Sequence, residues 1–164
     1  MAGPFGGARP RACRKTPEME YRLFGAREVP RRFVLVFETG DDVMAEMQRF
    51  AEEQNVMAAF FKGLGGFQHA TVGFYNLDQQ RYEPIEVGEQ VEVLSLLGNV
   101  AIYDGKPKLH IHCTLSYRDG HAVGGHLLQA TVRPTLEVAL DELAGNLHRT
   151  DRPEIGIPLL DLTH

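Results

Sequence analysis

The sequence contains no tryptophan and only two cysteines, Cys13 and Cys113, among its 164 residues. Two thiols are too few for a disulfide-stabilised secreted scaffold, and they favour a reducing compartment. Apolar stretches end after a handful of residues, far short of the roughly 20 that a membrane-spanning helix needs. The first fifteen residues also lack the apolar run of a secretory signal. We therefore expect a cytoplasmic protein that does not span a membrane.

The composition is that of an ordinary globular domain, with 43% apolar and 24% charged residues. A chain of 164 residues is long enough to form one domain around a hydrophobic core. Residues 1–18 differ from the rest, because they are rich in Gly, Pro and Arg and show no hydrophobic period. We predict a flexible basic arm at 1–18 and a single folded domain at 19–164.

Charge is distributed unevenly along the chain. Residues 1–32 carry eight Lys or Arg against three Asp or Glu, a net charge of +5, whereas residues 33–164 carry nine against nineteen, a net charge of −10. DNA-binding proteins present several cations to the phosphates of the duplex, and the acidic body as a whole does not. If nucleic acid binds, we expect the arm to contact it, through Arg9, Arg11, Arg14 and Lys15.

Hydrophobic periodicity in the first half of the domain predicts strands around one helix. The predicted elements are a strand at 33–37, a helix capped by Asp41 or Asp42 and ending near Asn55, a strand at 56–62, a tight glycine turn at 63–66 and a strand at 69–75.

The second half is predicted to consist almost entirely of strands. Residues 91–103 form either two strands or one strand with a bulge at Gly98, and a hairpin follows at 109–117 and 122–132. Residues 134–143 favour a further strand, and the tail to Leu160 a short one. The predicted fold class is α+β, a mostly antiparallel sheet with a few flanking helices in a single domain.

Histidines gather in this hairpin: four of the seven fall within seventeen residues, at 110, 112, 121 and 126. His110 and His112 are two residues apart, so on a strand both side chains point to the same face, about 6 to 7 Å from each other. His126 lies on the returning strand and is the candidate for a third ligand.

The length of the hairpin loop decides whether His126 joins the other two. A two-residue turn at Asp119–Gly120 would send His126 to the opposite face of the sheet. A three-residue loop at 118–120, ending in a left-handed glycine, instead sets His112 directly across from His126. A bulge at Gly124–Gly125 would have the same result.

Three neutral imidazoles that converge are a suitable set of ligands for Zn²⁺ or another divalent transition metal, with a fourth position left for water or a small ligand. The alternative is that the same histidines are partly buried and bonded to backbone carbonyls, or form a cluster on the surface. Spacing alone leaves both interpretations open.

If the histidines bind zinc, one possible function is that of a zinc-dependent small-molecule hydrolase or lyase, which activates a metal-bound water. The candidate general bases are Glu92, Glu137 and Asp119, but none has a recognisable catalytic spacing. A cupin-type site lacks its glutamate, because Ser116 occupies that position. Cys113 follows a ligand candidate and should face away from it on a strand, as a core thiol.

Several segments together resemble the plants and prokaryotes conserved (PPC) domain, which plant AT-hook proteins carry and which bacteria and archaea have alone. The similarity runs from about Tyr21 to Leu160. Its most specific feature is the ordered pair of His-x-His and Gly-Gly-His after a Glu-Val-Leu-Ser strand. The segments that carry it are Gly88–Val100, Leu109–His112, Gly120 and Gly124–Leu127.

The resemblance implies properties beyond those the residues themselves indicate. Similar members form a compact antiparallel-rich α+β domain and assemble as homotrimers. Prokaryotic members with this histidine trio are associated with zinc, which by motif match would be held by His110, His112 and His126. DNA binding has been proposed for the family, largely because the plant members carry a separate AT-hook.

The basic arm departs from that hook. An AT-hook needs an Arg-Gly-Arg-Pro-like core that enters a narrow minor groove, whereas Gly7–Arg11 has Ala8 where glycine belongs. The arm is therefore either a degenerate hook, a solubilising extension or the result of an overlong start assignment.

Overall fold

A computed structural model describes residues 19–24 and 30–163. The predicted arm at 1–18, with Arg9, Arg11, Arg14 and Lys15, lies outside the described residues. The fold is mostly antiparallel sheet, with 65% of residues in strands. One helix is present in the described ranges, where the predicted fold class had a few. No helix in them is long and apolar enough to cross a membrane.

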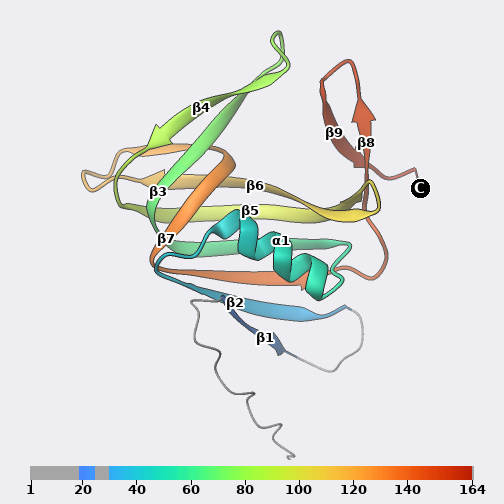
Figure 1. The fold of residues 1–164 in the computed structure, drawn as a ribbon, viewed down its shortest axis with the longest axis horizontal. Helices are drawn as coiled ribbons and strands as arrows, with labels where there is room; N and C mark the ends of the chain where they lie inside the picture. The colour runs from blue at the N-terminus through green and yellow to red at the C-terminus, as the bar shows by residue number, and fades with distance from the viewer. Residues whose placement is uncertain (1–18, 25–29, 164) are drawn as a thin grey trace, which may run out of the picture.

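The helix and nine strands follow one another along the chain in a single domain (Figure 1). Their bounds are β1 Glu20–Phe24, β2 Arg32–Glu38, α1 Val43–Glu53, β3 Ala59–Asn76, β4 Arg81–Val87, β5 Val91–Tyr103, β6 Lys106–Ser116, β7 Ala122–Glu142, β8 His148–Arg152 and β9 Ile157–Asp161.

Four strands pair in a closed circuit that forms the centre of the molecule. β3 pairs with β5, β5 with β6, β6 with β7, and β7 returns to β3, each time antiparallel. β1 and β2 extend the sheet from β7, and β4 forms a hairpin with β3. β8 joins β5 through a single parallel bridge between Ile102 and His148 and pairs with β9 in a separate hairpin.

The predicted glycine turn at 63–66 is wrong, because β3 runs through it as one strand of 18 residues. The strand bulges between Gly63 and Gly65, where β7 passes very close. A Cβ atom on Gly65 would lie 2.3 Å from the carbonyl oxygen of Thr135, and one on Gly66 equally close to that of Arg133. These glycines therefore allow β7 to pass close to the backbone of β3, and they do not reverse the chain.

Other boundaries differ in the same direction, toward longer strands. β5 is one strand whose irregularity lies between Val93 and Ser95, rather than at Gly98. β7 joins the two strands predicted at 122–132 and 134–143 into one of 21 residues. β4, whose sequence contains Pro84, was not predicted.

The single described helix covers one face of the sheet. Asp42 caps it by accepting a hydrogen bond from the Ala45 amide at 2.9 Å, so the second of the two predicted caps is the one used. Its buried side chains pack toward β6 and β7. They are Val43, Met47, Phe50 and Ala51.

The opposite face of the sheet carries apolar side chains that remain exposed, and we name it the open face. A row of cross-strand partners runs over it from Val34 of β2 through Ala139, Lys62 and Leu97 to His112 of β6. Leu64 and Leu94, beside this row, are 61% and 59% exposed. The other apolar members are Val36 and Phe60. The predicted histidine ligands thus lie at the edge of an apolar surface.

Candidate metal centre

The hairpin between β6 and β7 closes with the three-residue loop that the sequence predicted. The Tyr117 amide donates to the His121 carbonyl and the Gly120 amide donates to the Tyr117 carbonyl, both at 3.0 Å. Gly120 has φ +88°, the left-handed conformation that this loop needs. His112 therefore lies directly across from His126 in the ladder. The register prediction is confirmed, and it needs no bulge at Gly124–Gly125.

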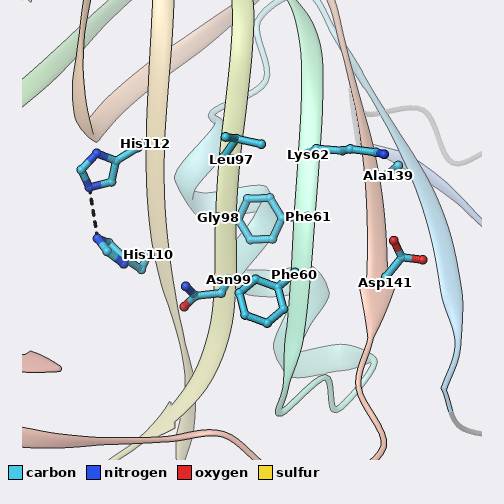
Figure 2. A pocket seen from close by; sticks show the side chains of 10 residues that line it. All are labelled: Phe60, Phe61, Lys62, Leu97, Gly98, Asn99, His110, His112, Ala139 and Asp141. Atoms are coloured by element: carbon cyan, nitrogen blue, oxygen red, sulfur yellow. Dashed lines mark hydrogen bonds between the residues drawn. The ribbon is translucent and has the colours of Figure 1, made fainter. Parts of the chain in front are cut away.

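The three predicted ligands converge. One ring nitrogen of each of His110, His112 and His126 lies within 4.8 Å of the others. The Nε2 atoms of His110 and His112 are 3.2 Å apart. A dashed line marks this contact in Figure 2. This separation suits a hydrogen bond, and it also matches the ~3.3 Å between two nitrogens bound tetrahedrally to Zn²⁺ at 2.0 to 2.1 Å. Folding thus brings the rings to nearly the spacing that a metal requires.

The environment favours the neutral form of His110 and His126, the form that binds a metal. Burial, followed by the charges of His110, His112 and Arg149, lowers the pKa of His126 to about 4. Burial and the same arginine also lower the pKa of His110. A buried ring nitrogen of His126, Nδ1, makes no hydrogen bond to the described residues. Such an orphaned polar atom is costly, and a metal ion bound through this nitrogen would satisfy it. The residues present therefore fit a divalent transition metal.

A tyrosine positions the third histidine. The ring of Tyr82 stacks on His126 with centroids 4.5 Å apart. It can do so because Gly73, the neighbour of His126 on β3, has no side chain: a Cβ there would lie 2.9 Å from the Tyr82 ring. The phenol is itself partly buried, and this burial raises the pKa of Tyr82. An apolar ring thus shields one side of the cluster.

The β3–β4 and β8–β9 hairpins extend from the same side of the molecule (Figure 1). The Tyr75 hydroxyl donates to the carbonyl of Ile155 at 2.7 Å, and the Gln80 amide donates to carbonyls of the same β8–β9 turn. The tips of the β3–β4 and β8–β9 hairpins are therefore tied together. They hold Tyr82 of β4 and Arg149 of β8 near the histidines.

A hollow of about 520 Å³ opens next to His110 and His112 on the open face (Figure 2). Asn99 lines it and is the cross-strand partner of His110. Its apolar walls include Phe60 and Leu97. This volume is in the range of small-molecule sites.

Comparison with known proteins assigns the chain to a family. Residues 25–144 match the model of the Plants and Prokaryotes Conserved domain, abbreviated PCC or PPC. The chain belongs to this family. The resemblance carried by the histidine and glycine motifs is thereby confirmed.

Solved structures share the fold. A metal-containing protein from Archaeoglobus fulgidus is 32% identical, with 87% of this chain and 96% of that chain covered and a TM-score of 0.74. A proposed DNA-binding protein from Bacteroides thetaiotaomicron has a TM-score of 0.80 over 88% of this chain and 99% of that chain. Its identity is 22%, so this second similarity shows the fold alone.

A curated relative is much longer than this chain. The bifunctional protein GlmU of Synechococcus sp. is 31% identical over 120 residues, which are 71% of this chain but 18% of that protein. The chain thus spans about a fifth of this relative, and GlmU's activities do not transfer to it.

The candidate bases of the enzymatic alternative do not join the histidines of this PPC domain. Asp119 lies in the hairpin loop and accepts hydrogen bonds from His121. Glu92 pairs with Ser116 near the loop end of the hairpin, and Glu137 lies on β7 beside Val36. No carboxylate in the described ranges belongs to the metal-ligating group.

Cys113 behaves as the sequence predicted. It is buried in the core, and burial raises the pKa of its thiol to about 11. The side chains of its strand neighbours His112 and Thr114 are exposed. A Cys–His nucleophile pair is therefore ruled out at this position.

Sequence reasoning missed the residues around the histidines. Tyr82 lies in a strand with a proline and two glutamates, which gave no strand signal. Arg149 lies 23 residues beyond His126, in a segment that only the family resemblance had included. Cross-strand pairing identifies Asn99, but only once the β5–β6 register is known.

Proposed function

We propose that this protein is a zinc-binding, homotrimeric PPC-domain protein that acts as a DNA-binding regulatory protein. The convergence of His110, His112 and His126 on one face of the hairpin carries this proposal. The histidines would hold Zn²⁺ or a similar divalent transition metal, which would supply a Lewis-acidic centre with an open coordination position. The metal-containing relative from Archaeoglobus fulgidus supports this.

Self-association is supported by the open face. Leu64, Leu94, Leu97 and Phe60 are each at least half exposed, a large amount of apolar surface for adjacent side chains. A second hollow, of about 460 Å³, adjoins the first along Lys62, Leu97 and Ala139. Packing of this face against other copies of the chain would bury it, and the family resemblance supplies the threefold arrangement.

DNA binding is supported by membership of the PPC family, for which DNA binding has been proposed, and by the charge distribution along the chain. Since residues 33–164 carry a net charge of −10, the cations for the phosphates come from the arm. Three arms in one trimer would act together, because linking weak sites increases the avidity of the whole.

Deleting residues 1–17 is expected to weaken duplex binding at least tenfold, because the deletion removes Arg9, Arg11, Arg14 and Lys15. For the intact protein, affinity should fall steeply between about 50 and 200 mM salt. Fluorescence anisotropy with a labelled duplex measures both effects. Replacing Lys106, an exposed cation of the body, by glutamine is the control and should change affinity less than twofold. Equal affinity with and without the arm would contradict the role given to it.

The enzymatic alternative, a zinc-dependent hydrolase or lyase, depends on the open metal position alone. A general base within hydrogen-bond reach of the reacting group is needed for such chemistry. The candidates Glu92, Glu137 and Asp119 lie outside the group of converging residues. The regulatory function is therefore the better supported of the two.

A further inference from the structure

Arg149 is a buried cation without an acidic partner. Only 9% of its surface is exposed, yet it forms no ion pair with any carboxylate in the described part of the chain. One terminal nitrogen donates to Asn99 Oδ1 at 2.5 Å and the other makes a long contact of 3.4 Å with the Pro158 carbonyl. Its Nε atom is buried and has no hydrogen-bond partner among the residues that the structure describes. Removing a guanidinium from water without pairing it is costly, so this arrangement needs an explanation.

The position of Arg149 explains why its guanidinium is buried without an acidic partner in the described ranges. Its partner Asn99 is the cross-strand neighbour of His110 and lines the hollow beside the histidines. The guanidinium is near enough to act electrostatically on His110, His126 and Tyr82. No acidic group in residues 19–24 and 30–163 acts on either of these histidines. The unpaired cation and the candidate metal centre therefore belong to one neighbourhood.

The charges of this neighbourhood do not balance. Three neutral imidazoles contribute no negative charge to a divalent metal, and Arg149 adds a further positive charge. An anion is the complement that such a site lacks, since buried charges in proteins are normally paired.

We propose that the site takes a small carboxylate ligand, which pairs with Arg149 and reaches the open position of the metal held by His110, His112 and His126. This inference rests on the proposed metal centre and names the ligand class of that centre. The guanidinium fork matches the planar geometry of a carboxylate. Among the described residues Arg149 Nε has no acceptor, and a carboxylate oxygen would supply the one that this nitrogen lacks. The hollow's apolar lining would accept the carbon chain.

Cobalt-loaded full-length protein provides the test, because the visible absorption of Co²⁺ changes when its ligands change. Titration with sodium propionate is expected to shift the spectrum saturably, whereas inorganic phosphate should not compete at equal concentration. Arg149→Gln should weaken propionate binding at least tenfold, the usual range for losing a hydrogen bond to a charged group. Arg149→Lys, which keeps the charge but not the fork, should weaken it less. Arg152→Gln, an exposed arginine of the same strand, is the control and should stay within twofold.

The outcomes separate this inference from the function on which it rests. Wild-type protein that takes up no cobalt overturns the metal centre, and the ligand with it, before propionate is added. Cobalt-loaded protein whose spectrum ignores propionate, or responds only to phosphate, overturns the carboxylate assignment alone. That assignment is also overturned if both Arg149 variants remain folded and bind propionate as tightly as wild type does. The titration of wild-type protein with propionate does not depend on the variants, so it still tests the carboxylate assignment if the variants fail to fold.

Discussion

Replacing both Leu64 and Leu94 by aspartate is expected to convert a trimer into monomers of 18.3 kDa. Both side chains lie on the open face and are more than half exposed in the isolated chain. Burying a leucine side chain stabilises an interface by ~1.5 to 3 kcal/mol, and each trimer would bury six of these leucines. Aspartate would remove this gain and leave charges buried without partners. Light scattering coupled to size exclusion gives the mass directly.

The matched control is Leu77→Asp. Leu77 follows β3 at the tip of its hairpin and is 65% exposed, so the substitution adds the same charge to a similarly exposed leucine away from the open face. This variant should keep the mass of the wild-type protein. A wild-type mass of one chain, or a double aspartate variant that remains trimeric, would contradict the assignment of the interface.

Removing the metal is expected to lower the melting temperature of the protein by about 5 to 10 °C. A ligand present at a hundred times its dissociation constant stabilises the folded state by ~2.7 kcal/mol. In a chain of this size, 1 kcal/mol corresponds to about 2 to 4 °C. Differential scanning fluorimetry before and after dialysis against a chelator, and after zinc is restored, measures the change.

Two histidine variants make this measurement specific. His112→Ala should abolish the response to zinc, and because His112 is exposed its removal should leave the fold intact. His121→Ala removes an exposed histidine of the hairpin loop, which bonds to Asp119, and should respond as wild type does. An equal zinc response in both variants would show that the stabilising metal binds elsewhere.

The candidate ligands could be predicted from the sequence because their geometry is local. A loop of three residues with Gly120 in the left-handed conformation determines the register of its hairpin, and the register determines that His126 faces His112. Alternation along a strand then places His110 beside them. None of these steps requires knowledge of the rest of the fold.

The errors arise where a distant strand decides the local structure. Glycines at 63–66 are typical of a turn, but β3 continues through them because β7 passes within contact distance of their backbone. The two strands predicted at 122–132 and 134–143 join because β7 pairs with β6 and β3 at one end and with β2 and β3 at the other. The periodicity of the sequence does not indicate where distant strands cross.

The residues around the histidines could not be predicted from the sequence for the same reason. Arg149 reaches Asn99 because β8 lies beside β5, through the bridge between Ile102 and His148. Tyr82 reaches His126 over Gly73, across a pairing of strands far apart in the sequence. Metal-binding histidines within one hairpin can thus be predicted from the sequence. The surrounding residues that would select a bound small molecule cannot.

Elemental analysis of the purified full-length protein beside its His126→Ala variant tests the metal centre most directly. With zinc supplied during expression, we expect close to one equivalent of zinc or a similar transition metal per wild-type chain, and less than a tenth of an equivalent in the variant. Equal metal contents in the two proteins, whether high or negligible, would contradict binding by these three histidines.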